Sequence, residues 1–296
     1  MELVNILIST YNGEQYIEKQ IESIIKQTYP SIKIYIRDDG STDKTLDILQ
    51  KYSNDERITV IQGDNVGFGS SFMQLLDMAA EGEYWAFCDQ DDIWDDCKVK
   101  NAVEKLRTME YNEPNMYFHN FYLTDENMNI IGVYSNRISG YSFQMAITEC
   151  LHMGFATVIN KTLRDLMLKG DIMNLRSHDW WAELIVMEFG NVYTDDYIGA
   201  MHRRLDSSLS SSSLKSRVKW FFSALKGNSE ICNLTRQFKI VFEDKMNEKD
   251  RKVLSWFDNS RYNLIVALKK CFYYKRWRSS IISELVVRIL MLVGKI

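Results

Sequence analysis

The sequence predicts an α/β fold in which helices flank a mostly parallel sheet, followed by a helical C-terminal region. In the first hundred residues, short apolar runs alternate with helix-like patterns, as in successive βα units. Polar clusters directly follow three of the apolar runs, where the carboxyl ends of parallel strands meet. Beyond a serine-rich stretch at 207–213, apolar residues recur at helical spacing among lysines and arginines, so we expect helices throughout 214–296.

The expected elements follow one another in an alternating order along the first half of the chain. Apolar runs predict strands at 3–8, 32–36, 58–61 and 84–88. Apolar residues three and four positions apart predict helices near 17–25, 46–52, 72–79 and 99–106. After residue 115 the pattern is weaker. It predicts strands at 116–123, 156–159 and 191–193, and helices near 142–150, 161–169 and 179–188.

Charge divides the chain into two parts. The net charge of the whole sequence is only −4. Residues 1–213 contain 18 Lys and Arg against 33 Asp and Glu, a net charge of −15, whereas residues 214–296 contain 18 against 7, a net charge of +11. We therefore expect a domain at 1–206, a connection at 207–213, and a basic helical region at 214–296 that meets a different partner.

Composition excludes several classes of protein. With 296 residues, 46% of them hydrophobic and 26% charged, the chain is long and apolar enough for a large core, unlike a disordered or collagen-like chain. The five cysteines form no CxxC pair, which predicts reduced thiols and no structural zinc site. The segment MELVNILIST lacks a basic region and a long apolar core, so we expect no signal peptide and a cytoplasmic location.

Three carboxylates crowd the end of the fourth expected strand. Asp89, Asp91 and Asp92 follow the apolar run 84–88 directly. Like charges at this spacing raise each other's pKa unless a cation neutralises them. A hard divalent cation such as Mg²⁺ or Mn²⁺ takes oxygen ligands and keeps positions open for substrate phosphates. The alternative is that Asp92 and the acids after it only cap the following helix.

Two further strand ends carry polar candidates for ligand binding. Asp39 follows the second strand, where it can accept hydrogen bonds from a base or a ribose, or simply form an Asp-Gly turn before a capped helix. Thr10 and Tyr11 follow the first strand. An aromatic ring at that place can stack on a nucleobase, although tyrosine more often only packs.

Four motifs occur in a fixed order along the chain, namely Val4–Gly13, Asp38–Asp43, Asn65–Gly67 and Asp89–Trp94. Their order and spacing resemble those of the inverting family 2 glycosyltransferases with the GT-A fold, and most of all the bacterial rhamnosyltransferase-like members. The resemblance spans roughly residues 3–205. It implies that Thr10, Tyr11 and Asp39 bind the nucleotide base and ribose, that Asp89 and Asp91 form a DxD motif with Asp91 as the metal ligand, and that Asp92 contacts sugar hydroxyls.

The resemblance also implies residues on the acceptor and phosphate sides. Asp179, within the segment Ser177–Trp181, stands where the family has its catalytic base, and its alternative role is to cap the helix that follows. His202 and Arg203 are candidates for metal and phosphate contacts, respectively. The segment 201–207 departs from the Tyr-Arg-x-His pattern of some relatives, which leaves this alignment open by one or two positions.

The resemblance implies a metal-dependent inverting glycosyltransferase that uses Mg²⁺ or Mn²⁺. The expected reaction moves L-rhamnose from dTDP-L-rhamnose onto a hydroxyl of a lipid-linked or growing cell-wall or capsular polysaccharide. The alternatives are a UDP-hexose or UDP-N-acetylhexosamine donor, or a nucleotide-sugar-binding protein without catalysis. A sugar nucleotidyltransferase is disfavoured because the first loop has one glycine and an acid instead of a basic glycine-rich loop.

The basic tail has two competing interpretations. Aromatic and aliphatic residues interleaved with Lys and Arg fit a helix lying on an anionic leaflet, which predicts a peripheral protein at the inner face of the plasma membrane. Alternatively, the tail packs on the catalytic domain or on another copy in a homo-oligomer. Glu284 and Arg288 interrupt the apolar stretch, so we expect no membrane span. Nucleic acid is not an expected partner, because no recognition motif accompanies the charge.

Overall fold

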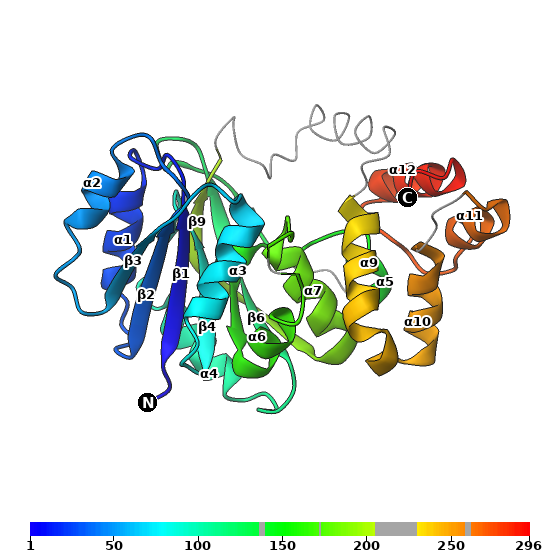
Figure 1. Cartoon of the computed structure of the whole chain (residues 1–296), viewed down its shortest axis with the longest axis horizontal. Helices are drawn as coiled ribbons and strands as arrows, with labels where there is room; N and C mark the ends of the chain where they lie inside the picture. Colours follow the sequence, from blue (N-terminus) through cyan, green and yellow to red (C-terminus); the bar gives the residue numbers. More distant parts are fainter. Residues whose placement is uncertain (136–139, 172, 205–229, 258–261) are drawn as a thin grey trace. The chain divides into compact units, whose positions relative to one another are not determined.

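A computed structural model describes residues 1–135, 140–171, 173–204, 230–257 and 262–296 (Figure 1). The chain divides into two compact units. Unit 1 comprises residues 1–136 and 152–205, and unit 2 comprises residues 137–151 and 206–296. The serine-rich stretch 207–213 lies outside the described residues. The sequence did not indicate that residues 137–151 leave the first unit and join the second.

Unit 1 is built on a nine-stranded sheet in the order β3-β2-β1-β4-β8-β6-β9-β5, with β7 pairing with β6. The strands are β1 (Val4–Thr10), β2 (Ile32–Asp38), β3 (Ile58–Gln62), β4 (Tyr84–Asp89), β5 (Ile93–Trp94), β6 (Asn115–Thr124), β7 (Ile130–Tyr134), β8 (Thr157–Asn160) and β9 (Asn191–Arg203). The first four strands are parallel, whereas β8 runs antiparallel to both β4 and β6. The expected α/β fold is confirmed, with a sheet that is parallel in its first half and mixed in its second.

Helices of unit 1 flank this sheet (Figure 1). They are α1 (Ile17–Ile25), α2 (Thr45–Gln50), α3 (Phe68–Met78), α4 (Lys98–Leu106), α6 (Lys161–Met167) and α7 (His178–Phe189). The apolar spacing explains their packing. Ile17, Ile21 and Ile24 lie on one face of α1 and are fully buried in a core with Ile6 and Ile34 of the sheet. Burial of each such side chain stabilises the fold by about 1.5–3 kcal/mol.

The parallel register brings the sequence motifs to one edge of the sheet. Thr10 of β1 pairs with Asp38 of β2, and Ser9 pairs with Asp89 of β4. Because all three strands point the same way, the loops that follow them emerge together. The carboxyl edge of the sheet is therefore where a ligand site is expected in an open α/β fold.

Strand β9 is much longer than the three residues expected from the sequence. It spans 13 residues, from Asn191 to Arg203, because β6 offers it a partner along almost its whole length. Asp195, Asp196 and Gly199 are poor strand formers, which explains why the sequence pattern stopped short. The far end of β9 pairs with β5, with Ile93 opposite Met201. This pairing carries His202 and Arg203 to the carboxyl edge of the sheet.

Unit 2 is helical within the described residues. Its helices are α5 (Phe143–Ala146), α9 (Glu230–Phe242), α10 (Glu248–Leu254), α11 (Leu264–Cys271) and α12 (Ile281–Leu292). Trp277 is fully buried at the centre of this unit, and its carbonyl accepts the hydroxyl of Thr148 from the inserted segment. In the part of the chain that the structure describes, no helix is both long and apolar enough to cross a membrane.

Candidate active site

The loops after β1 and β2 are joined by hydrogen bonds that shape one wall of the site. The backbone N–H of Asn12 donates to Ser41 Oγ (2.9 Å), and Asn12 Oδ1 accepts the N–H of Thr42 (2.8 Å). Asn12 adopts a left-handed backbone conformation with a φ of 49°, which asparagine tolerates better than most residues. The first two motifs therefore form one connected surface.

Asp39 is held by the third motif as well as by its own strand. Its carboxylate is almost fully buried, forms an ion pair with Arg37, and accepts the backbone N–H groups of Val66 and Gly67 at 3.0 Å each. Gly67 has a φ of 83°, a conformation that glycine adopts without strain. Oδ1 accepts from both Arg37 and Val66, whereas Oδ2 accepts only from Gly67 among the described residues, so Oδ2 can still accept a ligand hydroxyl.

Gln90, which sequence reasoning did not select, connects the first and fourth motifs. Its Oε1 accepts the hydroxyl of Thr10 (2.6 Å) and the N–H of Tyr11 (3.0 Å), and its Nε2 donates to the carbonyl of Tyr11 (3.2 Å). A Cβ at Gly13 would lie 2.7 Å from Thr10 Oγ1 and clash with Gln90 itself. The side chain of Tyr11 is 46% exposed, which leaves its ring accessible to a ligand.

We call Asp89, Asp91 and Asp92 the acidic cluster. Burial, together with the charges of Asp92 and Asp91, raises the pKa of Asp89 well above its usual value. Burial and the charge of Asp92 raise the pKa of Asp91 to about 6. Asp92 is fully buried. Its Oδ1 accepts His202 Nδ1 (2.8 Å), and its Oδ2 has no hydrogen-bond partner among the described residues. The cluster thus holds more negative charge than its surroundings readily accommodate.

His202 supplies part of the opposing charge. Burial by itself would lower its pKa, but Asp92 and the rest of the acidic cluster outweigh this effect and raise it to about 9. The ring stacks on Phe155 with their centroids 4.4 Å apart. At neutral pH His202 is therefore protonated, and it must release this proton before it can bind a metal.

Arg203 and Lys98 place two further cations near the acidic cluster. Arg203 donates through Nε to the carbonyl of Asp91 (3.2 Å), and its guanidinium lies over the ring of Tyr16. Lys98 is fully buried, donates to the carbonyl of Phe155 (2.6 Å), and has its pKa lowered to about 7 by burial. The burial of Lys98 is not predictable from the sequence, because a lysine at the start of a helix normally extends into water.

The acidic cluster contains carboxylate oxygens, the donor atoms that Mg²⁺ and Mn²⁺ prefer. Among the described residues, no group of three or more His, Cys, Asp or Glu side chains is arranged to hold a metal ion. Magnesium sites that bind nucleotides commonly use only one or two carboxylates together with substrate phosphates. Asp89 and Asp91 offer such carboxylates, and their pKa values are raised first by burial and then by the neighbouring carboxylates. The donor set therefore fits a hard divalent cation completed by a diphosphate.

Asp179 lies in the first turn of α7, with one carboxylate oxygen engaged in capping. Its Oδ1 accepts the N–H of Trp180 (2.8 Å) and the hydroxyl of Ser177, whereas its Oδ2 accepts only a long bond of 3.4 Å from the N–H of Gly154. The charge of Asp179 also contributes to raising the pKa of Asp89. The ring of His178, next to Asp179, packs on Phe87 of β4 with their centroids 4.6 Å apart, so the start of α7 lies beside the strand that ends at Asp89.

A close approach between α3 and the segment before α7 positions Asp179. A Cβ on Gly69 would lie 2.6 Å from the carbonyl oxygen of Arg176 and would clash with the carbonyl of Leu175. The hydroxyl of Ser70 donates to the carbonyl of Met173 (2.9 Å). Only a residue without a side chain at position 69 allows this packing.

His178 and Trp181, on either side of Asp179 and Trp180, are buried, whereas Trp180 is half-buried. His178 packs against Phe72, Phe87 and Phe68 with centroids 4.2–5.1 Å apart, and burial lowers its pKa to about 4 although the charge of Asp179 opposes this shift. Trp181 is fully buried and donates to the carbonyl of Met167. His119 and His152 are also buried.

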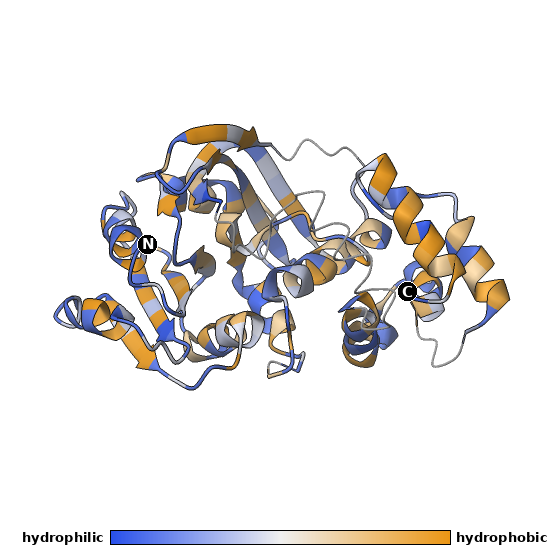
Figure 2. Ribbon diagram, turned by 90° about the horizontal axis from the view of Figure 1, so that it is seen from above, coloured by the Kyte–Doolittle hydropathy of each residue, from blue (hydrophilic) through white to orange (hydrophobic). Residues whose placement is uncertain are grey.

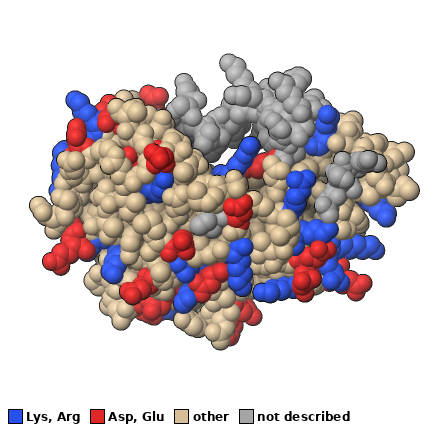
Figure 3. Space-filling view, viewed as in Figure 1, with Lys and Arg blue, Asp and Glu red and all other residues tan. Residues whose placement is uncertain are grey.

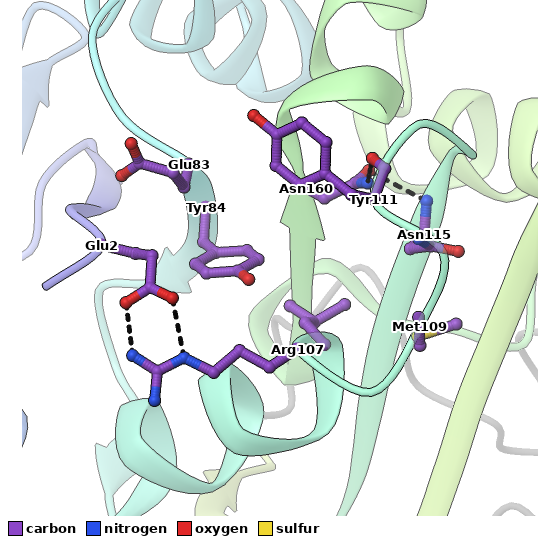
Figure 4. A pocket seen from close by; sticks show the side chains of 9 residues that line it. Glu2, Glu83, Tyr84, Arg107, Met109, Tyr111, Asn115 and Asn160 are labelled. Carbon is purple, nitrogen blue, oxygen red and sulfur yellow. Dashed lines mark hydrogen bonds and ion pairs between the residues drawn. The ribbon is translucent and has the colours of Figure 1, made fainter.

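A surface pocket of about 210 Å³ lies at the opposite edge of the sheet (Figure 4). It opens at the start of β4 beside Tyr84, where Glu2 and Arg107 form an ion pair. Residues that line it belong to none of the four motifs. This pocket therefore does not take part in the candidate active site.

Comparison with protein families matches residues 5–166, more than half of the chain, to the family described as Glycosyl transferase family 2. The chain is 35% identical over 136 residues to the UDP-Glc:alpha-D-GlcNAc-diphosphoundecaprenol beta-1,3-glucosyltransferase WfaP of Escherichia coli, covering 46% of this chain and 52% of the relative. It is 33% identical over 184 residues to the dTDP-rhamnosyl transferase RfbG of Shigella flexneri, covering 59% of this chain and 63% of the relative. The matches thus span about half to two thirds of these relatives.

Solved structures with a similar fold include S. aureus TarS 1-349, with a TM-score of 0.61 and 17% identity over 99% of this chain and 80% of that chain. Another is the mannosyltransferase PcManGT from Pyrobaculum calidifontis in complex with GDP-Man and Mn²⁺, with a TM-score of 0.56 and 15% identity over 86% of this chain and 68% of that chain. At these identities the likeness concerns the fold, and it confirms the expected GT-A type.

Proposed function

Because the chain belongs to glycosyl transferase family 2, we propose that it transfers one sugar from a nucleotide diphosphate donor to a hydroxyl group, with inversion at the sugar carbon. The observation that carries the proposal is the meeting of the acidic cluster and Asp179 at one edge of the sheet. His178, next to Asp179, packs on Phe87, two residues before Asp89, with ring centroids 4.6 Å apart, and the charge of Asp179 adds to the raised pKa of Asp89. A donor-side charge cluster and an acceptor-side carboxylate are what an inverting transfer requires.

Asp179 acts as the base in this proposal. The acceptor oxygen forms a bond to the sugar carbon while the bond to the nucleotide diphosphate breaks, and the hydroxyl proton passes to Asp179 Oδ2. This oxygen is the better acceptor because Oδ1 is already engaged by Ser177 and Trp180. The neutral His178 beside it stays out of proton transfer, since burial holds its pKa near 4.

The donor is bound by the loops after β1, β2 and β4. Tyr11 stacks on the base, and Thr10 and Asp39 contact the base and ribose. Asp91, with Asp89 and His202, holds Mg²⁺ or Mn²⁺, which when bound offsets the charge of the departing diphosphate. Arg203 lies on the phosphate side. Asp92 contacts sugar hydroxyls through Oδ2, which has no hydrogen-bond partner among the described residues.

The proposed donor is dTDP-L-rhamnose, and the name of the Shigella flexneri relative supports this choice. The name of the Escherichia coli relative supports a UDP-hexose as the alternative donor. The same name includes a diphosphoundecaprenol acceptor. We therefore propose a lipid-linked or growing cell-surface polysaccharide as acceptor, with the protein acting at the inner face of the plasma membrane.

Replacement of Asp179 by Asn tests the reaction. We expect Asp179→Asn to bind donor nucleotide as the wild type does and to lower kcat at least about a hundredfold, the range that general-base catalysis contributes. Asp47→Asn, an exposed acid on α2, is the matched control and should leave both quantities unchanged. Transfer at the wild-type rate by Asp179→Asn would remove Asp179 from this role.

A donor screen separates the enzyme from a binding protein without catalysis. Nucleotide release is measured with dTDP-L-rhamnose, UDP-glucose and UDP-N-acetylglucosamine, each with Mn²⁺ and with EDTA. Release from one donor in the presence of metal supports the proposal. Tight binding without release from any donor, with an acceptor extract present, would favour the non-catalytic alternative, and equal affinity in EDTA would contradict the metal role of Asp91.

A further inference from the structure

Helices α11 and α12 pack against each other and leave a large apolar surface uncovered. Their inward residues, such as Ala267 and Val287, are buried. We call the outward residues, each 40–77% exposed, the outer face: Leu264, Ile265, Leu268, Phe272, Ile281, Ile282, Leu285, Ile289 and Val293. Figure 2 shows both helices with most of their length in the hydrophobic colour. Contiguous exposed apolar surface of this kind marks an interaction site.

The exposed charge on α11, α12 and the connection between them has a single sign. Residues 262–296 contain seven Lys and Arg but one acid, Glu284. That carboxylate is 8% exposed and accepts the N–H groups of Trp277 and Arg278 as well as Arg288 Nε, at 2.6–2.8 Å. The exposed charged residues of these helices and their connection are Lys269 and Arg276. The outer face is therefore apolar with a cationic border.

A lipid surface fits this combination better than a second copy of the chain. A symmetric dimer through the outer face would bring two cationic borders together, and like charges across an interface oppose association. An anionic bilayer supplies both an apolar interior and opposite charge. Helix α12 has 12 residues, a length of about 18 Å, so it can lie in the headgroup region but cannot cross the bilayer.

We propose that the outer face of α11 and α12 inserts into the headgroup region of an anionic bilayer. Insertion of Leu285 and Ile289 supplies apolar burial, while Lys269 and Arg276 contact lipid phosphates. This inference rests on the proposed function in one respect, since an acceptor in the membrane would explain why the protein binds a bilayer. Lipid binding itself is measured without donor or acceptor.

Flotation of the full chain with vesicles tests the proposal. We expect the wild type to float with vesicles of phosphatidylglycerol and phosphatidylcholine and to stay unbound with phosphatidylcholine alone. The double variant Leu285→Ser, Ile289→Ser should partition at least about tenfold more weakly, since two exposed side chains lose their apolar burial. Ile240→Ser is the matched control, because Ile240 is 78% exposed on α9 and lies outside the outer face.

Three results would overturn the inference or assign it elsewhere. Equal partitioning of the wild type and the double variant would overturn it. Dimerisation without lipid that the double variant abolishes would identify a second copy as the occupant. Nucleotide release with a water-soluble acceptor is measured in parallel. Flotation without nucleotide release would contradict the proposed function alone. Nucleotide release without flotation would contradict this inference alone. Normal release by the double variant also shows that it folds.

Discussion

Single side chains connect the motifs of the site to one another. Gln90 binds the loop that carries Thr10 and Tyr11, and Arg37 binds Asp39. These contacts couple the loops proposed to bind the nucleotide to the segment that carries the acidic cluster. A change at Gln90 should therefore affect donor binding even where it leaves the acidic cluster itself unaltered.

Gln90→Leu tests this coupling. The variant loses the acceptor for Thr10 Oγ1 and for the N–H of Tyr11, each worth about 0.5–1.5 kcal/mol, so we expect the KM for donor to rise roughly tenfold with a smaller change in kcat. Thr10→Val removes the same hydroxyl bond from the other side. In a double-mutant cycle on donor KM the two effects should be less than additive, whereas full additivity would rule out the coupling.

His178 links stability to pH through its buried, neutral ring. Its pKa is about 4 in the folded chain against an ordinary value of 6.5, because burial disfavours the charged form. The unfolded chain therefore binds more protons between pH 6.5 and pH 4, and stability is lost as pH falls through this window. His178→Phe should reduce the loss between pH 7 and pH 5 by about 2 kcal/mol.

Hydrogen exchange protection in peptides covering 84–89 and 178–189 measures this effect. Between pH 7 and pH 8 the ring is neutral in both states, so wild type and His178→Phe should respond alike, which serves as the internal control. An identical loss of protection at pH 5 in the two proteins would contradict the buried, neutral state of His178.

Whole elements position the site through close backbone contacts. Helix α3 meets the segment before α7 at Gly69, and β9 carries His202 to Asp92 by pairing with β5. Gly69, Ile93 and Met201, which make these backbone contacts, have no proposed part in the reaction. The geometry of the site therefore depends on residues that perform no chemistry.

Gly69→Ala tests the contact between α3 and the segment before α7. The added Cβ would clash with the backbone of Leu175 and Arg176, so the start of α7 must shift and carry Asp179 with it. We expect kcat to fall at least about tenfold, since displacement of a catalytic group by about 1 Å is costly. Gly132→Ala is the control, because its Cβ would meet only Leu123 at 3.7 Å. Equal activity of the two variants would contradict this role.

Over the whole molecule, the two parts of the chain differ in net charge and in the site that each contains. The acidic residues 1–213 include the candidate active site, and the basic residues 214–296 include the outer face. Figure 3 shows few charged side chains at the position of α11. Unit 2 also takes in residues 137–151, whose Gln144 and Glu149 bond to Asp250 and Ser279, respectively. Unit 2 is therefore formed from two separate segments of the chain, 137–151 and 206–296.

A chain shortened at Leu205 tests this connectivity. Residues 143–147 are buried within unit 2, so their amides should lose hydrogen exchange protection when 206–296 are removed, by at least about tenfold. Peptides from β1 and β4 serve as the control and should keep their protection. Retained protection across 143–147 in the shortened chain would show that this segment folds with unit 1.

The alternation of strands and helices and the order of the four motifs are predictable from the sequence, because apolar periodicity and turn residues are local properties. The sequence also assigns Asp39, Asp91 and Asp179 to their segments, but not the residues that each of them contacts. Those contacts, the burial of Lys98 and the length of β9 depend on tertiary structure.

Pairing with β6 makes Asn191–Arg203 a strand in spite of its poor strand formers. The backbone of 175–176 leaves no room for a side chain at Gly69, and Gln90 accepts the hydroxyl of Thr10. The outer face shows the same division. The sequence shows its apolar and cationic residues, but which of them remain exposed depends on how α11 and α12 pack. Periodicity is fixed by neighbours along the chain, whereas exposure, pKa and proximity are fixed by neighbours in space.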